Sequence, residues 1–328
     1  MAETTGKQAD SAERPGEIDA RPVRHPWQWV GVVVIAILAA MLINSFVTNP
    51  KWDWSFVWRV MEYRPVLEGL VKGTVICTIA SMVVGIVLGI LLAIMRLSTN
   101  PVLRFVSFVY IWFFRAVPRY VLLVVLGVGV LYLYPKLDFG VPFSKELGHF
   151  IGLKDGMTFY SLDVKTISSG IIVGIIGLGL SEAAYMAEIA RAGLLSVDTG
   201  QEEAASALGM SRGQAMRRII LPQAMRVIVP PTGNETIAMV KDTSLLSAVP
   251  VSTELFFQAN AVANSTYLVM PALMAALIWY LIVCSVLMVG QTYLERYFGR
   301  GFGSQSSNSR QGAAGRLRQL AQLGGGGK

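Results

Sequence analysis

Long apolar runs, separated by shorter polar stretches, follow one another along most of this chain. A helix needs about 20 mainly apolar residues to cross the hydrocarbon core of a bilayer. Runs that can contribute such a helix cover residues 27–46, 65–97, 120–134, 166–189, 224–249 and 267–290. Between them, residues 105–120 predict a re-entrant or interfacial helix, and residues 135–165 predict a polar external loop. The pattern therefore predicts an all-α, polytopic membrane protein with about six transmembrane helices.

The two ends of the chain differ in character from the apolar runs. Residues 1–26 are polar and interrupted by proline, so we expect them to be disordered and cytoplasmic. Residues 27–47 predict an extra transmembrane anchor helix. A cleaved signal peptide is the alternative, but the polar leader is long and no A-x-A-like cleavage site follows. Residues 298–328 are rich in Gly and Ser and predict a flexible cytoplasmic tail.

Composition and charge support the membrane interpretation. The 328 residues are 53% hydrophobic and only 15% charged, whereas soluble domains carry about 25% charged residues. The net charge of +7 comes from Lys and Arg that flank apolar runs, which favours cytoplasmic loops over nucleic-acid binding. With six spans, one side of the membrane carries the following arginines: Arg96, Arg104, Arg191, Arg212, Arg217, Arg218 and Arg296. That side is predicted to be cytoplasmic and to hold both termini.

The sequence offers little chemistry for catalysis or for metal binding. Cys77 and Cys284 both lie inside apolar runs, and the two histidines, His25 and His149, are isolated. We therefore expect neither a metal site nor a structural disulfide. The chain has no H-E-x-x-H, G-x-S-x-G or G-x-x-x-x-G-K-[ST] motif, so a membrane-embedded enzyme is not favoured and ATP would have to bind elsewhere.

A charged, helix-prone loop at residues 197–222 interrupts the apolar pattern. Asp198 or Thr199 can cap a first short helix, and Gly209 stands where a left-handed residue would end it. A second helix begins with a capping box at Ser211–Gln214. Isolated short helices are rarely stable without partners. The loop therefore predicts a docking element for a soluble partner.

The same loop carries a motif. The pattern E-A-A-x3-G-x9-I-x-L-P is matched by Glu203, Ala204, Ala205, Gly209, Ile219, Leu221 and Pro222. In this motif the chain resembles permease subunits of bacterial ABC importers, and its flanking sequence resembles the polar amino-acid branch. The resemblance implies a binding-protein-dependent (type I) permease domain over residues 60–297, with the loop as the coupling helix. Pro222 is expected to kink or end the second loop helix as it re-enters the membrane.

The resemblance also implies the partners. A cytosolic ABC ATPase dimer would hold ATP and Mg²⁺, so no cofactor is expected on this chain. An extracytoplasmic or lipid-anchored binding protein would deliver a polar amino acid, and a second permease subunit, identical or not, would complete the path. The surroundings would be lipid of the bacterial inner membrane, with no nucleic acid. An ATP-independent secondary transporter is the alternative, but no internal repeat typical of such folds is evident.

Polar residues at membrane depth predict a substrate path, because they are costly unless they face protein or water. These residues are Glu182, Tyr185, Asn234, Glu235, Lys241, Asp242 and Ser244. The stretch PPTGNETI at 230–237 is expected to break its helix and turn polar groups toward a central site. Alternatively, Lys241 and Asp242 form a purely structural pair at the external interface.

Two positions depart from the pattern of the branch. Glu182 stands where a small or hydroxyl residue is usual, and Arg119 replaces an apolar residue. Our hypothesis is that Glu182 and Glu235 make the cavity acidic and favour a cationic substrate such as arginine or lysine. The alternative is that one or both carboxyl groups are protonated or paired within the bundle. Glu188 is expected to form an ion pair with Arg191, three residues further along the helix.

Overall fold

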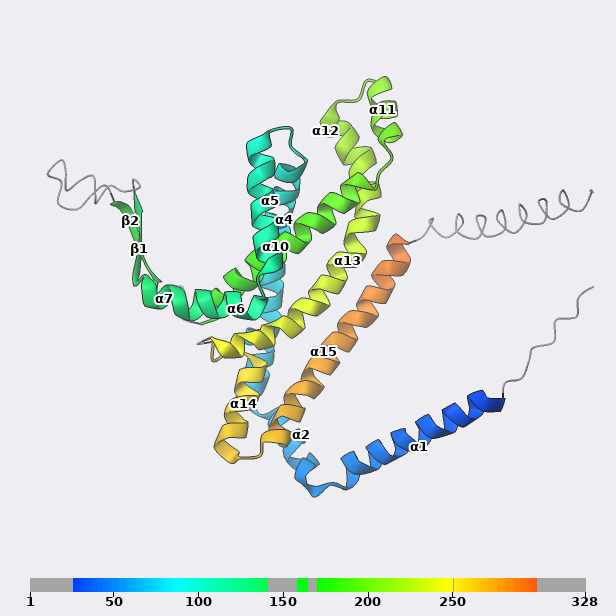
Figure 1. Ribbon diagram of the computed structural model, residues 1–328, viewed down its shortest axis with the longest axis vertical. Helices are drawn as coiled ribbons and strands as arrows, with labels where there is room; N and C mark the ends of the chain where they lie inside the picture. The colour runs from blue at the N-terminus through cyan, green and yellow to red at the C-terminus, as the bar shows by residue number, and fades with distance from the viewer. Residues whose placement is uncertain (1–25, 141–157, 165–169, 250, 300–328) are drawn as a thin grey trace, which may run out of the picture. The chain divides into compact units, whose positions relative to one another are not determined.

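The structure is a computed structural model that describes residues 26–140, 158–164, 170–249 and 251–299 (Figure 1). The chain divides into two compact units, Met1–Trp52 and Asp53–Lys328. The predictions for the terminal segments 1–25 and 300–328 concern residues outside the described ones.

The first unit contains helix α1 (Pro26–Thr48), followed by a short 3₁₀ turn. The stretch Trp27–Thr48 has a hydropathy of 2.6, well within the range of spanning helices. Its side chains are exposed along the helix, as expected where hydrocarbon would surround them. Phe46 stacks on Trp52 with ring centroids 4.8 Å apart, which fixes the end of the helix. The predicted extra helix is therefore present and long enough to span.

Helices form almost all of the second unit. They are α2 (Trp54–Glu62), α3 (Arg64–Gly69), α4 (Ile76–Leu97), α5 (Pro101–Ala116), α6 (Arg119–Val124), α7 (Val130–Leu133), α10 (Ile171–Leu195), α11 (Thr199–Ala207), α12 (Arg212–Ala215), α13 (Leu221–Asp242), α14 (Leu255–Thr266) and α15 (Val269–Phe298). Turns of π-helix join α3 to α4, α6 to α7 and α12 to α13, and a 3₁₀ segment, η5 (Thr243–Ala248), follows α13. This confirms the all-α expectation.

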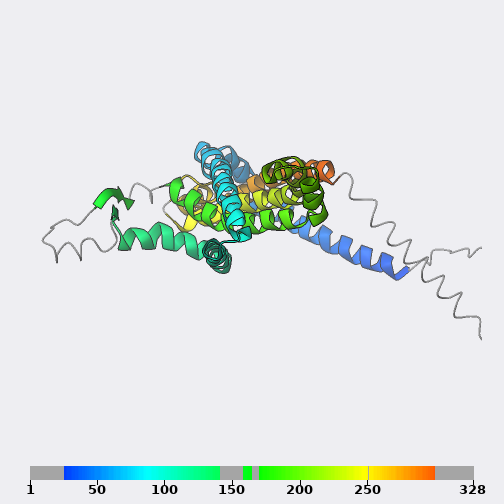
Figure 2. The ribbon, with the colours of Figure 1, turned by 90° about the horizontal axis from the view of Figure 1, so that it is seen from above.

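Four helical stretches in the described part of the chain are long and apolar enough to cross a membrane: Trp27–Thr48, Arg64–Leu97, Ile171–Leu195 and Val269–Phe298. The number rises to five if α5 and α6, which meet at an angle of 102°, count as one broken span. Figure 2 shows α6 and α7 leading away from α5, which is seen end-on. The predicted span at 224–249 is helical, but its polar residues keep α13 below the hydropathy of the other spans.

One predicted loop contains regular structure. Residues 135–165 were expected to form a polar external loop, but β1 (Lys136–Gly140) and β2 (Thr158–Asp163) pair as an antiparallel hairpin. Phe139 lies opposite Tyr160 in the register, with ring centroids 6.4 Å apart. Cross-strand aromatic pairs of this kind stabilise hairpins, which explains why an apparently irregular segment forms strands.

Glycines on α3 and α4 allow two other elements to approach closely. A Cβ at Gly85 would lie 2.7 Å from Cγ of Glu182 on α10, and one at Gly89 would meet the backbone of Ala187 at 3.0 Å. Gly69 and Gly73 similarly face the backbone at the start of α14. Both glycine pairs therefore sit at helix contacts, as small residues do in membrane bundles.

Apolar side chains complete the packing in three clusters. One joins α2 and α3 to α14 and α15, where the Trp279 indole also donates to the Met61 carbonyl oxygen at 3.1 Å. The second joins α4, α6, α10 and α13, and the third joins α4, α5 and α10. Helix α10 contributes to two of these clusters and is the most buried of the candidate spans. It is therefore the central helix against which the polar residues are arranged.

Candidate functional site

The charged loop between α10 and α13 has the predicted local structure. The Asp198 carboxylate caps α11 by accepting from the Gly200 amide at 2.7 Å. Gly209 adopts a φ of +73°, which reverses the chain after α11. The Ser211 hydroxyl and the Gln214 side chain form the capping box that begins α12, with bonds of 3.3 and 2.9 Å. These sequence predictions are confirmed.

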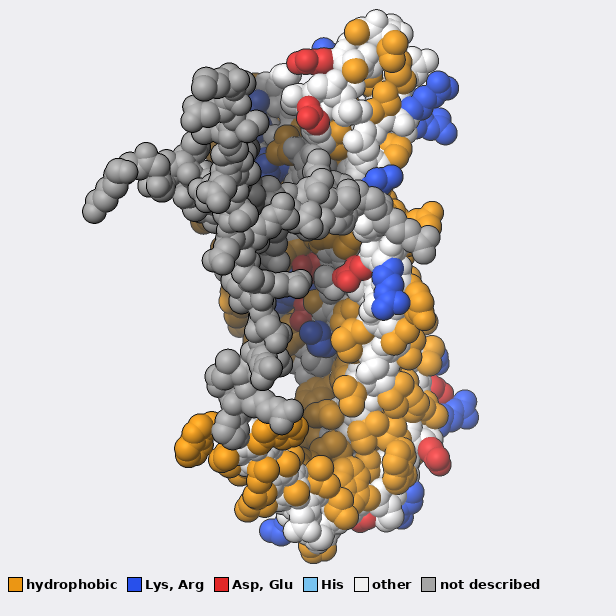
Figure 3. Space-filling view, turned by 90° about the vertical axis from the view of Figure 1, so that its right-hand side faces the viewer, with side chains coloured by type: hydrophobic (Ala, Val, Ile, Leu, Met, Phe, Trp, Pro, Cys, Tyr) orange, Lys and Arg blue, Asp and Glu red, His pale blue; other side chains and the backbone are white. Residues whose placement is uncertain are grey.

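The loop projects from one end of the helices, beyond α10 and α13 (Figure 1). Glu203 and Ala204 are exposed, whereas Ala205 is buried. Leu208 at the tip is a large apolar side chain that is 80% exposed. Acidic and basic side chains stand apart on this end, and hydrophobic side chains cover the surface below it (Figure 3). The loop therefore presents an apolar tip between groups of opposite charge.

The remaining motif residues lie where the loop returns to the long helices. Ile219 is half-buried, while Leu221 and Pro222 are exposed. Of the two expectations for Pro222, that it ends the second loop helix is wrong, because α12 continues through a π-helical turn into α13. Pro222 lies just after that π-helical turn, inside a continuous helix, and π-helical turns and prolines are both sites of local helix distortion.

The predicted break at residues 230–237 is also wrong. Pro230 and Pro231 lie inside α13, which runs without interruption from Leu221 to Asp242. Two side-chain donors reach carbonyl oxygens around the prolines: the Thr232 hydroxyl bonds the oxygen of Ile228 at 2.8 Å, and the Gln291 amide bonds that of Pro230 at 2.7 Å. The oxygens that lose a donor to the prolines are those of Arg226 and Val227, four residues earlier, so these two bonds do not replace the missing ones. The Gln291 bond instead ties α13 to α15 at this point.

Three of the predicted path residues instead gather around the guanidinium group of Arg119. Arg119, the first residue of α6, donates from Nη2 to Oε2 of Glu182 on α10 at 2.9 Å, and from Nη1 to Oδ2 of Asp242 at the end of α13. Its Cζ lies 4.9 Å from the centre of the Tyr185 ring. This ionic cluster, Arg119, Glu182, Tyr185 and Asp242, therefore joins α6, α10 and α13.

Glu182 does not face an open cavity. Its side chain is fully buried, and its ion pair with Arg119 shows that the alternative of pairing within the bundle holds for this residue. Glu182 also interacts electrostatically with Glu235, which is half-buried on α13. In this structure Glu182 therefore faces Arg119 rather than an open cavity.

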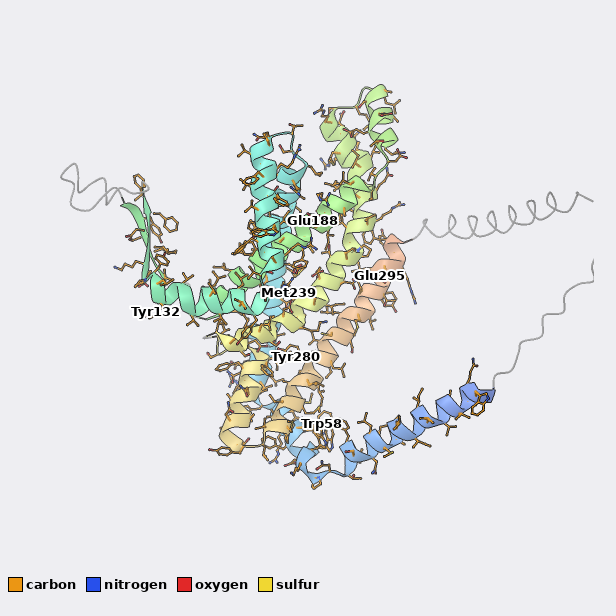
Figure 4. The ribbon with its side chains drawn as sticks, in the orientation of Figure 1. Trp58, Tyr132, Glu188, Met239, Tyr280 and Glu295 are labelled. Atoms are coloured by element: carbon orange, nitrogen blue, oxygen red, sulfur yellow. The ribbon has the colours of Figure 1, made fainter. Side chains whose placement is uncertain are left out.

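The other predicted residues lie outside the cluster. Glu188 pairs with Arg191 at 2.7 Å, as expected, on the part of α10 nearer the loop (Figure 4). Asn234 is exposed. Lys241 and Ser244 line a cavity of about 400 Å³ together with Tyr280. The proposed structural pair between Lys241 and Asp242 is not found, because Asp242 is paired with Arg119.

A second buried carboxylate was missed by the sequence analysis. Glu254 is fully buried and caps α14 by accepting from the Phe257 amide at 3.1 Å. It also accepts from the Thr74 hydroxyl at 3.1 Å and from the Tyr280 hydroxyl. Ser, Thr, Asp and Asn are the usual capping residues, so a glutamate before this helix gives only a weak signal in the sequence. Glu254 thus links the α3–α4 span, α14 and α15.

No cluster of His, Cys, Asp and Glu suited to a metal ion occurs among the residues that the structure describes. Cys77 and Cys284 are both buried and free.

Comparisons with known proteins identify the fold. The family model described as "Binding-protein-dependent transport system inner membrane component" matches residues 85–300. The arginine transport system permease protein ArgU of Corynebacterium glutamicum is 41% identical over 93% of this chain and 90% of its own length. The glutamine transport system permease protein GlnP of Escherichia coli is 36% identical over 43% of this chain and 62% of its own length.

A solved structure agrees with these relatives. The crystal structure of an amino acid ABC transporter with histidines matches with a TM-score of 0.57 and 27% identity, covering 74% of this chain and 98% of that chain. The chain therefore belongs to the family of inner-membrane components of binding-protein-dependent transport systems. Within that family it is a multi-pass permease subunit of an ABC transporter, as its motif predicted.

Proposed function

We propose that this permease couples ATP hydrolysis by a separate ATPase to the import of polar amino acids with a cationic side chain. The observation that carries the coupling is the projecting α11–α12 loop, with its exposed motif residue Glu203 and its exposed tip residue Leu208. A short pair of capped helices with an apolar tip suits insertion into a groove on a soluble partner. The partner is the cytosolic ABC ATPase dimer, which holds ATP and Mg²⁺.

The rest of the assembly follows from this orientation. The loop and both termini face the cytoplasm of a bacterial cell, and the opposite side of the inner membrane receives an extracytoplasmic or lipid-anchored binding protein. A second permease subunit, identical or closely similar, completes the path. Lys241, Ser244 and Asn234 on and after α13 contribute to that path as polar groups that are at least partly accessible in one subunit.

Charge supports a cationic substrate. The carboxylates of Glu182, Glu235 and Asp242 lie in the same stretch of the helices as the cations of Arg115, Arg119 and Lys241. In a region of low dielectric constant, a carboxylate that is not held by a cation of the chain favours a ligand that brings a positive charge. The relative ArgU is named for arginine transport, which agrees with this inference.

Uptake in proteoliposomes tests the proposal. The permease is reconstituted with its ATPase and binding protein, and radiolabelled arginine and glutamine are supplied with and without ATP inside. We expect ATP-dependent uptake with arginine preferred, and loss of that uptake in Glu203→Arg while the permease remains folded. Glu202→Arg is the matched control, because it reverses the neighbouring charge outside the motif. Uptake that persists without ATP would instead indicate a secondary transporter.

A further inference from the structure

The corner between α5 and α6 directs a guanidinium group into an acidic site. Arg119 follows Pro118 directly after the 102° bend, so the turn itself aims its side chain back across α10 and α13. The Arg119 side chain is only 14% exposed, and its two carboxylate partners lie 63 and 123 residues away in the sequence. Such an arrangement is specific to this fold and does not result from local helix geometry.

The surroundings of this group have the composition of a guanidinium-binding site. Carboxylates are the strongest partners of guanidinium, and an aromatic face stabilises the same cation. Glu182 and Asp242 supply the carboxylates, and the Tyr185 ring supplies the aromatic face at 4.9 Å. The chain therefore holds its own side chain in a site that would equally suit a ligand with the same head group.

Arg119 fills this site incompletely. Each of its two terminal nitrogens bonds a different carboxylate, so neither carboxylate is bound in the two-pronged manner that guanidinium allows. As a result, Oε1 of Glu182 is buried and has no hydrogen-bond partner in the described part of the chain. Buried polar atoms are normally satisfied, so this exception calls for an explanation, and a functional role is one explanation for such an atom.

We propose that Glu182, Asp242 and Tyr185 form a binding site for the guanidinium group of an imported amino acid, and that Arg119 occupies this site until the substrate displaces it. The proposal rests on the proposed function and names the residues that set its substrate preference. The substrate's guanidinium can bond both oxygens of Glu182, which Arg119 does not. Displaced Arg119 lies at a bend between two helices, where a change in backbone angle can move it away.

The occupancy of the site by Arg119 determines the apparent affinity of the site for a cationic substrate. A ligand that competes with a tethered group binds more weakly in proportion to the fraction of time that the site is free. If Arg119 occupies the carboxylates for about nine-tenths of the time, its removal strengthens binding of a cationic substrate about tenfold. A neutral analogue, which gains nothing from the freed carboxylates, should not bind more tightly.

Direct binding to the permease–ATPase complex in nanodiscs tests this without the selectivity of the binding protein. Radiolabelled arginine is compared with citrulline, which has the same shape but a neutral urea group. We expect Arg119→Gln to bind arginine about tenfold more tightly than the wild type does and to leave citrulline binding unchanged. Arg104→Gln removes the same charge from an exposed position at the start of α5 and should change neither.

Arg119→Lys covers the case in which Arg119→Gln does not fold. It keeps the cation, but an ammonium group cannot bridge two carboxylates as a guanidinium does, so the site should open more readily. Arginine binding should then strengthen by a smaller factor. Equal changes for arginine and citrulline, or none in either Arg119 variant, would show that the cluster is only structural and overturn the proposal. If the wild-type complex binds and imports no cationic amino acid, the proposed function itself fails.

Discussion

Glu254 offers the sharpest test of how buried polar groups stabilise this fold. Replacing it by Ala removes the cap of α14 and leaves the hydroxyls of Thr74 and Tyr280 without their acceptor in a buried site. A lost cap costs about 1 kcal/mol. Each buried hydroxyl left unpaired costs about 1.5 kcal/mol. The sum is about 4 kcal/mol, which corresponds to a decrease of roughly 10 °C in Tm for a domain of this size.

Thermal unfolding of the purified permease in detergent, followed by tryptophan fluorescence, measures this effect. Glu254→Gln keeps the shape and one acceptor oxygen, so it should cost only about 1 kcal/mol. Glu68→Ala is a second control: it also removes a glutamate with two partners, Arg64 and Lys72, but at a side chain that is 45% exposed. Exposed ion pairs contribute about 0–1 kcal/mol. A Tm for Glu254→Ala close to that of Glu68→Ala would refute the reasoning.

Two further predictions concern glycines. Gly73→Ala should destabilise the protein by about 2 kcal/mol, because the new methyl group would overlap the backbone of Thr253 and Glu254. Gly290→Ala is the control: the space around Gly290 is open, so this substitution should raise the Tm or leave it unchanged. Gly209→Ala should lower the stability by about 1 kcal/mol, because Gly209 has a φ of +73°, and it should also lower ATP-driven uptake. Gly213→Ala in the adjacent helix should lower neither the stability nor the uptake. Unfolding and proteoliposome assays on the same preparations measure both effects.

Local features of the fold were predictable from the sequence, and long-range ones were not. The cap at Asp198, the turn at Gly209 and the capping box at Ser211 all depend on residues within a few positions of one another. The prediction of a broken helix is wrong because α13 is held by its packing against other helices, for example by the bond from the Gln291 amide, 61 residues further along the chain, to the Pro230 carbonyl. Nothing in the sequence around Pro230 indicates that partner.

The polar site shows the same division. Glu182, Tyr185 and Asp242 were each recognised as costly at membrane depth, and Arg119 was recognised as unusual, but their pairing across 63 and 123 residues required the structure. Glu254 was missed altogether, since its partner Thr74 is 180 residues away and its capping role resembles that of any acidic residue before a helix. Residue type indicates that a partner must exist, while topology determines which one it is.

Glycines of the α3–α4 span make room for both buried carboxylates. Gly73 lets the backbone at Glu254 approach, and Gly85 makes room for the Glu182 side chain. The two centres differ in how completely they are satisfied. Glu254 accepts bonds from three donors, whereas Oε1 of Glu182 has none among the described residues. A fully satisfied buried polar network rigidifies the core around it. Glu254 therefore belongs to the frame of the permease, whereas Glu182 keeps the free acceptor oxygen on which the proposed guanidinium site depends.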